Sequence, residues 1–230
     1  MSRRILRHLL NPFRTGWPDQ ARAIVQAPIV ANMLDSLTFS RHSRLQVLNA
    51  GSGEGLYSPL LLKLTCNGTV IELDPAYAVR NPRKLDERQM HVAGTLTSLP
   101  LQSGWANLVI CSEVLEHIED DRRAIAEIVR VTAPGGHILI TVPTPPAAFD
   151  PAHVREGYLA SELGSLLCDA GLRVLLTRHC MFGFFRFIMK WWRVVPWIPR
   201  PVLWTLSYAD RHLRLGPPMD LLLLCVNEAA

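Results

Sequence analysis

Short apolar runs alternate with segments of helical periodicity along most of the chain after residue 45. This alternation is typical of repeated strand, helix, strand units, which build a parallel sheet covered by helices. The apolar runs predict strands at 45–49, 69–73, 90–93, 107–111, 137–142, 172–177 and 221–226. The periodic segments predict helices at 56–64, 120–131 and 161–170, with a turn at 133–136 that ends the second helix. We therefore expect one α/β core domain.

About 40 residues separate the last two apolar runs, whereas connections in such folds usually take roughly two to six residues. In this insertion one predicted helical face is apolar, with Phe184, Phe187, Ile188, Trp191 and Val195. Another face carries Arg186, Lys190 and Arg193, and prolines precede a second helix near 202–212. The predicted organisation is a basic helical arm at 1–44, a core at 45–180 and 218–230, and the helical insertion at 181–217, which we expect to set specificity.

Positive charge gathers in two parts of the chain, although the net charge is only +4. Residues 1–44 carry seven Lys and Arg, and residues 173–217 carry eight together with nine of the seventeen aromatic residues. Interleaved basic and aromatic residues favour an anionic lipid surface, the alternative being an ordinary hydrophobic cap with a solvated basic face. No uncharged apolar run reaches the roughly 18 residues of a spanning helix. The insertion is therefore expected to lie on a membrane or over an acceptor site, but not to cross a membrane.

The five cysteines are widely spaced and form no C-x-x-C pair. This spacing favours buried thiols in a reducing compartment over a metal knuckle or a disulfide framework. The basic start is followed by no long apolar run or small-residue cleavage site, so no signal peptide is expected. We expect a cytoplasmic protein that can associate peripherally with the inner leaflet.

The first predicted strand ends in a glycine loop, Asn49-Ala50-Gly51-Ser52-Gly53-Glu54-Gly55. Glycines there let backbone N–H groups approach a ligand closely. The G-x-G-x-G spacing differs from that of dinucleotide folds, and a tight turn without a ligand is the alternative. Asp74 ends the second strand 23 residues after Gly51, where a carboxylate can bind a ribose diol. Glu72 is the competing acid, and Asp74 could instead serve only as a turn residue before Pro75.

Four segments occur in an order and at a spacing that resemble those of a known family. They are VLNAGSGEG, IELDP, GTLTSLPLQSGWANLVICSEVLEHIED and VRVTAPGGHILITVPTP. They are similar to the successive motifs of the class I, type 11 methyltransferases, over roughly residues 45–145, and the segments HVREGY and AGLRVLLTR extend the similarity toward 178. The resemblance implies a Rossmann-like, seven-stranded sheet with its last strand antiparallel and helices on both faces. It also implies S-adenosylmethionine as the cofactor.

The resemblance assigns cofactor contacts by position. It places Asn49, Ala50, Gly51 and Gly53 beside the methionine part, Asp74 at the ribose, Thr95 and Leu96 beside the adenine, and Ser112 and Glu113 at the sulfonium end. The family usually has acidic residues where Asn49, Thr95 and Asn107 stand. Asn49 and Thr95 keep hydrogen-bonding capacity without charge, which leaves an inactive relative as an alternative.

The run from Glu113 to His117 resembles the metal-binding E-x-x-E-H stretch of ubiquinone-pathway O-methyltransferases. Glu113, Glu116 and His117 could hold a divalent ion against a catechol-like hydroxyl pair. The favoured alternative is a helix-start carboxylate with an orienting histidine, so no metal is expected. His117 is the first candidate for a base that takes the acceptor's proton, followed by His153 and Tyr158. Each could instead be a polar surface residue or a satisfied core group.

These patterns predict transfer of a methyl group to an oxygen, nitrogen or carbon of an apolar small molecule. Quinone precursors, lipids or glycolipids, and polyketide-like metabolites are the candidate acceptors. Two alternatives stay open: a catalytically silent binding module, and a nucleic-acid or protein methyltransferase. Nucleic acid is not expected as a partner, because Cys111-Ser112-Glu113-Val114 stands where an N/D-P-P-Y/F motif would follow the fourth strand. The sequence leaves the oligomeric state open.

Overall fold

The computed structural model describes residues 19–37, 44–53, 55–65, 67–75, 86–147, 150–183, 185–186 and 200–228. One seven-stranded sheet runs through this part of the chain in the order β3-β2-β1-β4-β5-β7-β6. Its strands are β1 Gln46–Ala50, β2 Thr69–Leu73, β3 Gln89–Val92, β4 Ala106–Ser112, β5 Thr132–Pro143, β6 Leu172–Cys180 and β7 Asp220–Asn227. Pairs among β1 to β5 are parallel, and β7 lies antiparallel between β5 and β6. The expected sheet with an antiparallel last strand is confirmed.

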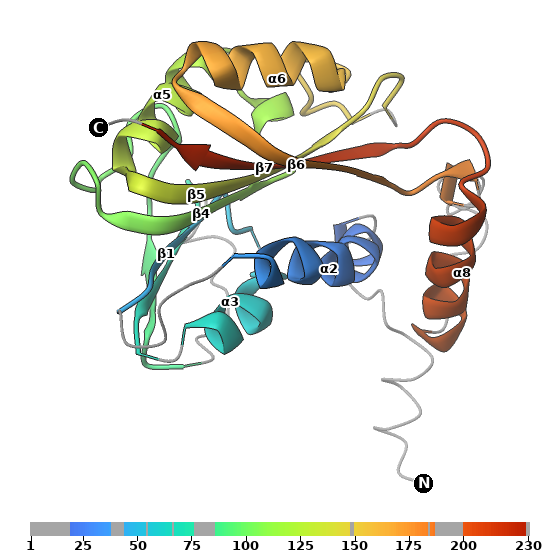
Figure 1. Cartoon of the computed structure of the whole chain (residues 1–230), viewed down its shortest axis with the longest axis horizontal. Helices are drawn as coiled ribbons and strands as arrows, with labels where there is room; N and C mark the ends of the chain where they lie inside the picture. The colour runs from blue at the N-terminus through green and yellow to red at the C-terminus, as the bar shows by residue number, and fades with distance from the viewer. Residues whose placement is uncertain are drawn as a thin grey trace, which may run out of the picture.

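Helices cover both faces of this sheet (Figure 1). Helices α5 Asp121–Val131 and α6 Ala160–Asp169 pack on one face, and α2 Asp19–Asp35 and α3 Ser58–Leu64 pack on the other. Helix α8 Arg200–Leu213 lies between β6 and β7 in the chain and contacts α2. A short 3-10 helix, η1 Leu115–His117, follows β4. The expected two-sided, Rossmann-like α/β arrangement is therefore present.

Helix α5 shows how the local sequence sets an element. Asp120 caps it by accepting a hydrogen bond from the Arg123 backbone N–H at 3.0 Å. The residues that face the sheet recur at helical spacing and are buried, namely Ala124, Ile125, Ile128 and Val131. The helix ends at Val131 because Thr132 takes an extended conformation and opens β5.

The expected turn at 133–136 lies inside β5 instead. Thr132 pairs with Ala106, and the register then shifts so that His137 pairs with Leu108. Gly135 has a φ of 72°, which accommodates this irregularity. The turn residues are thus absorbed as a bulge, and Asn227 fixes the start of the strand by donating to the Thr132 carbonyl at 2.8 Å.

The other predicted strands lie within three residues of the observed ends, and the helix expected near 202–212 is α8. The helix expected around Phe187 to Val195, and most of the cations assigned to its basic face, lie outside the described residues. The first 18 residues of the predicted arm also lie outside them. Among the helices that the structure describes, none has the length and apolar character needed to cross a membrane.

Candidate active site

The glycine loop is held against the end of β2. The backbone N–H groups of Gly51 and Ser52 both donate to the Leu73 carbonyl, at 2.8 and 2.9 Å. The Gly53 N–H donates to Asp74 Oδ2 at 3.0 Å. Gly51 and Gly53 have φ values of 76° and 52°, a region in which residues with a Cβ are strained. Asp74 is buried and shapes the loop directly.

The segment after β4 closes on the same loop. A Cβ built on Gly51 would lie 2.4 Å from Val114 Cγ2, closer than van der Waals contact allows. The order of the strands reverses between β1 and β4, so the carboxyl ends of β1, β2 and β4 meet at a topological switch point. Ligands in open α/β sheets bind in the crevice at this position. The predicted cofactor residues in the ends of these strands and the loops that follow are Asn49, Ala50, Gly51, Gly53, Asp74, Ser112 and Glu113.

Asn49 forms a buried pair with Glu72. The Asn49 Nδ2 donates to Glu72 Oε2 at 2.6 Å, and Gln89 Nε2 donates to Glu72 Oε1 at 3.1 Å. Glu72 therefore uses both carboxylate oxygens inside the sheet, which leaves Asp74 as the acid at the strand end. An acidic residue at position 49 would meet this carboxylate as a like charge, which accounts for the amide found there.

The residues expected beside an adenine differ in exposure. Thr95 is exposed and forms a β-bridge with Ser98, whereas Leu96 is buried in the core cluster. On the other side of the edge, Ser112 Oγ lies 2.8 Å from Thr141 Oγ1. Ala50 is fully buried at the end of β1, so only its backbone can face a ligand.

Glu113 takes part in a buried polar network that sequence reasoning missed. It has a φ of 55°, and its Oε1 accepts hydrogen bonds from Thr141 Oγ1 at 2.8 Å and Gln26 Nε2 at 3.1 Å. Arg22 Nη1 lies 2.7 Å from Glu113 Oε2. Arg22 and Gln26 belong to α2, so this helix is bonded to the segment that follows β4. No local pattern could reveal the network, because Gln26 and Glu113 are 87 residues apart.

Asp220 joins the network from β7. Its Oδ2 accepts a hydrogen bond from Gln26 Nε2 at 2.9 Å and lies 3.2 Å from Arg22 Nε. Burial raises the pKa of Asp220 to about 7, with the nearby Glu113 adding to the rise and the Arg22 guanidinium opposing it. One guanidinium thus serves the buried carboxyl group of Asp220 and the partly buried carboxyl group of Glu113. The Tyr57 hydroxyl completes the group by donating to Gln26 Oε1 at 2.6 Å.

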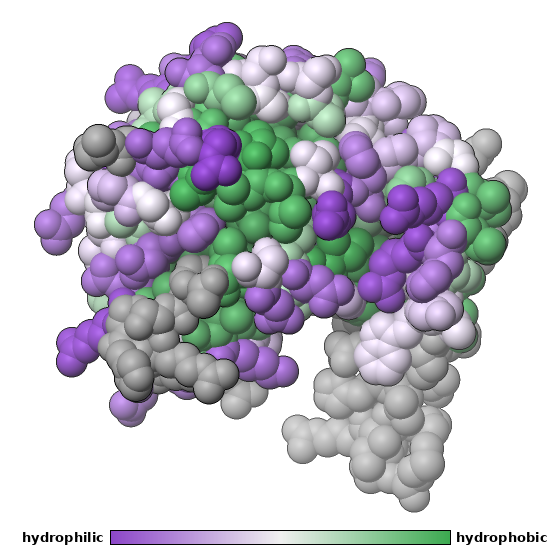
Figure 2. All heavy atoms as spheres, in the orientation of Figure 1, coloured by the Kyte–Doolittle hydropathy of each residue, from purple (hydrophilic) through white to green (hydrophobic). Residues whose placement is uncertain are grey.

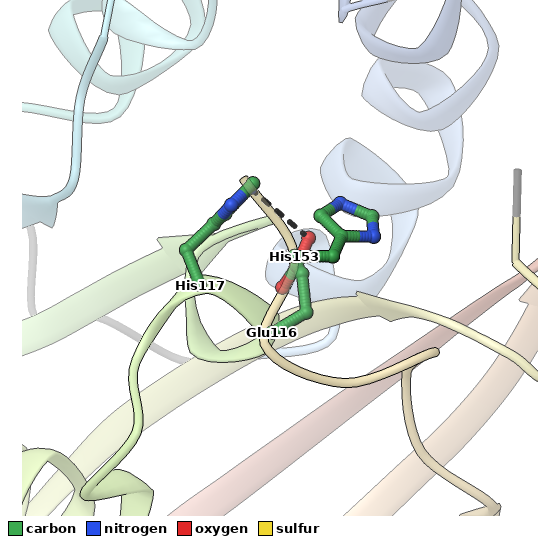
Figure 3. A group of neighbouring side chains, drawn as sticks. All are labelled: Glu116, His117 and His153. Atoms are coloured by element: carbon green, nitrogen blue, oxygen red, sulfur yellow. Dashed lines mark ion pairs between the residues drawn. The ribbon is translucent and has the colours of Figure 1, made fainter. Parts of the chain in front are cut away.

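Two of the predicted bases lie side by side, together with Glu116 (Figure 3). The His117 and His153 rings are 4.7 Å apart and nearly perpendicular. His117 Nδ1 lies 3.0 Å from the Ala152 carbonyl, and His117 Nε2 lies 3.9 Å from Glu116 Oε1. The Val154 N–H donates to the Glu116 carbonyl at 3.0 Å, which holds the loop of His153 against η1. Glu116 is fully buried, and burial together with the charge of Glu113 raises the pKa of its carboxyl group.

The third predicted base, Tyr158, has a different setting. Its side chain is buried, and its hydroxyl donates to Asp121 Oδ2 at 2.8 Å. Burial, and then this hydrogen bond, raise the pKa of the phenol. Arg155 also pairs with Asp121 and donates to the Ile118 carbonyl at 2.7 Å. Tyr158 thus anchors the loop that carries His153, and these contacts disfavour its use as a base.

Comparison with known proteins shows what the central part of the chain is similar to. Residues 48–140 match the family profile described as a methyltransferase domain. A probable S-adenosylmethionine-dependent methyltransferase of Mycolicibacterium smegmatis is 32% identical over 151 residues, which cover 60% of this chain and 55% of that protein. The ubiquinone biosynthesis O-methyltransferase of Xanthomonas oryzae is 31% identical over 123 residues, half of each chain. The chain thus spans about half the length of the curated relatives it matches.

A solved structure from Mesorhizobium loti, described as an S-adenosylmethionine-dependent methyltransferase, shares the fold. It has a TM-score of 0.61 and 17% identity, and the alignment covers 88% of this chain and 97% of that one. The strand order, the glycine loop and the acidic end of β2 agree with the sequence match. Residues 48–140 therefore match a methyltransferase domain in sequence, and the chain is similar to S-adenosylmethionine-dependent methyltransferases in sequence and in fold.

Proposed function

We propose that the chain transfers a methyl group from S-adenosylmethionine to an apolar small-molecule acceptor. The proposal rests on one observation: the glycine loop, Asp74 and the segment after β4 that contains Glu113 converge at the switch point of the sheet. Gly51 lacks a Cβ, which lets the segment after β4 approach the loop and brings these elements together. The sequence similarity to enzymes named for this cofactor supports the same conclusion.

The residues at this edge fit the cofactor. Ser52 Oγ is buried in the glycine loop and has no hydrogen-bond partner among the described residues, so it has capacity for a ligand. Asp74 adjoins the loop through Gly53, where a carboxylate can accept hydrogen bonds from a ribose diol. The bound cofactor supplies an electrophilic methyl group on its sulfonium.

The chain's own contribution is to orient the acceptor and to hold its proton. Methyl transfer is an in-line displacement, which depends mainly on positioning and on exclusion of water. An acceptor that carries a proton also needs a base. His117 is exposed, and its Nδ1 is placed by the Ala152 carbonyl, so its Nε2 is the nitrogen available to take that proton.

The acceptor class is tested by following a labelled methyl group. We expect label from S-adenosylmethionine to enter solvent-extractable small molecules when the protein is incubated with a cell extract fractionated by polarity. His117→Ala should lower that transfer by about 100-fold, the usual contribution of a positioned base, whereas replacement of the exposed His179 on β6 by alanine should not change it. Label found only in the nucleic-acid or protein fraction would contradict the acceptor class. Cofactor binding without any transfer would support the silent module.

We further propose that α8 rests on an anionic membrane surface, which would bring the site close to a lipid-like acceptor. Apolar side chains on and after this helix are exposed, including Trp204 at 59%, Tyr208 at 60% and Leu213 at 56%. Arg211 and Arg214 lie among them, and Figure 2 shows hydrophobic, pale and hydrophilic residues intermixed over α8. Aromatic side chains beside cations suit the headgroup region.

Vesicle binding tests the membrane proposal. The protein should cosediment with phosphatidylglycerol vesicles at low salt, and much less with phosphatidylcholine vesicles. A Trp204→Ala, Tyr208→Ala double variant should bind about 10-fold more weakly, because two large apolar groups are lost. Met90 is also exposed, but on β3, so Met90→Ala is the matched control and should bind normally. Equal binding by both variants would sink the proposal.

A further inference from the structure

Gln26 is a fully buried amide on α2 that joins three separate parts of the chain. Its Nε2 donates to Glu113 Oε1 at 3.1 Å and to Asp220 Oδ2 at 2.9 Å. Its Oε1 accepts a hydrogen bond from the Tyr57 hydroxyl at 2.6 Å. Tyr57 follows the glycine loop, Glu113 follows β4, and Asp220 begins β7. One side chain thus uses both of its N–H donors and its oxygen to connect elements around the candidate active site.

Glu113 is the member of this group with a strained backbone. Its φ of 55° lies in the left-handed region, which a residue with a Cβ rarely adopts and which persists only where the surroundings hold it. The Glu113 N–H donates to the Thr141 carbonyl at 2.9 Å, and Glu113 Oε1 accepts from Thr141 Oγ1 at 2.8 Å. Gln26 and Arg22 hold the same carboxylate from α2. The left-handed turn at Glu113 is therefore fixed jointly by β5 and α2.

The direction of the chain after Glu113 decides where two parts of the site lie. Val114 comes next and packs so close to Gly51 that a Cβ on this glycine would lie 2.4 Å from Val114 Cγ2. Leu115 then begins η1, which ends at His117, the proposed base. A change of φ at Glu113 would redirect both contacts, because φ and ψ are the soft dihedrals that set the path of the chain. The turn thus places the base and the neighbour of the glycine loop together.

Apolar packing keeps α2 on the sheet without help from the Gln26 amide. Four apolar side chains of this helix are buried in the hydrophobic cluster on this face, namely Val25, Val30, Met33 and Leu34. Loss of the amide should therefore leave the helix docked and loosen the Glu113 turn instead. We propose that Gln26 is a positioning residue for methyl transfer, which acts through the Glu113 turn on Val114 and His117. Its hold on the turn is independent of the reaction, whereas the consequence for methyl transfer rests on the proposed function.

Hydrogen exchange of the full chain, without any ligand, tests the hold on the turn. The N–H groups of His117 and Ile118 are hydrogen-bonded within residues 113–118, at 3.0 and 3.1 Å. Gln26→Met keeps the length of the side chain but removes its donors. Exchange in residues 113–118 should become at least about 10-fold faster, because a buried carboxylate loses a hydrogen bond there. Exchange in α5 should stay at the wild-type rate, whereas a general loss of stability would speed both segments.

Two further variants control for the substitution itself. Asn32→Met also replaces an amide on α2 by methionine, but at an exposed position, and should leave both segments unchanged. Tyr57→Phe is the milder change, because it keeps the Gln26 amide and removes only the hydroxyl that orients it. It should speed exchange at 113–118 in the same direction, which keeps the test decisive if Gln26→Met does not fold.

Glycine at position 113 shows whether Gln26 acts through Glu113. Glycine adopts a positive φ without a steric cost, and it has no carboxylate for Gln26 to hold. Gln26→Met should therefore speed exchange by less than about 2-fold when it is added to Glu113→Gly. Titration of the folded proteins with S-adenosylhomocysteine then measures the consequence for the site. Gln26→Met should bind about 10-fold more weakly than wild type, and Asn32→Met should bind normally.

The outcomes separate the inference from the proposed function. Normal exchange at 113–118 or normal cofactor affinity in folded Gln26→Met would overturn the inference. So would an equally large effect of Gln26→Met on exchange in the Glu113→Gly background. Wild-type protein that does not bind S-adenosylhomocysteine would refute the proposed function, while the exchange rates would still decide whether Gln26 holds the turn.

Discussion

Gly51→Ala is expected to lower the affinity for S-adenosylhomocysteine by at least about 100-fold, which corresponds to about 2.7 kcal/mol. The new Cβ would lie 2.4 Å from Val114 Cγ2, and the φ of 76° adds backbone strain. Either the glycine loop or the segment after β4 must then move, and both flank the proposed cofactor site. Isothermal titration calorimetry on the wild type and the variant measures the loss.

Gly135 offers a matched control for this substitution. Its φ of 72° is nearly the same, but a Cβ there would meet nothing within 4 Å. Gly135→Ala should therefore cost only the backbone strain, about 1–2 kcal/mol of stability, and leave cofactor affinity unchanged. If the two variants lose affinity equally, the close approach at Gly51 does not serve the cofactor.

Arg22→Met is expected to destabilise the protein by about 3–5 kcal/mol, because it leaves one buried and one partly buried carboxyl group without their cation. Arg22 contacts both Glu113 and Asp220, whose side chains are 14% and 0% exposed. Burial raises the pKa of Asp220 to about 7, and removal of the guanidinium that opposes this rise should raise the pKa further above its unfolded value. The unfolded chain then releases protons first as the pH rises above about 4, so the loss of stability should be larger at pH 8 than at pH 5.

Urea unfolding at pH 5 and pH 8 measures this effect. Arg173 supplies the comparison, because it pairs with Glu228 on the surface, where the two side chains are 57% and 54% exposed. Arg173→Met should cost at most about 1 kcal/mol, with little dependence on pH in this range. An Arg22→Met protein that is as stable as Arg173→Met would show that α2 is not held by this network.

The sequence predicted the sheet well because its strands are short, apolar and buried, and each is bounded by turn residues or by a helical period. It also located the glycine loop and Asp74, since their relation is set by one strand, helix, strand unit. It misjudged residues 133–136, where Gly135 permits a bulge within β5 instead of a turn before it. Whether a glycine turns or bulges depends on the neighbouring strand, which local pattern does not contain.

The polar groups of the site were harder to predict, because they depend on contacts between distant segments. Glu113 lies after β4 as predicted, but the bonds of its carboxylate to Arg22 and Gln26 of α2 were not predicted. His153 was named only as a base, and its position beside His117 depends on how the loop after β5 folds back onto η1. Side-chain partners across such separations follow from tertiary packing, whereas motif spacing reports only local structure.

Titration of the wild-type chain with S-adenosylhomocysteine is the most direct test of the central claim. We expect a single saturable site with a dissociation constant in the micromolar range. The reason is that the glycine loop, Asp74 and the segment after β4 meet at one edge of the sheet. Asp74→Asn should weaken that binding, because the ribose diol loses a charged acceptor. Absence of binding at millimolar concentrations, in protein shown to be folded, would contradict the proposed function.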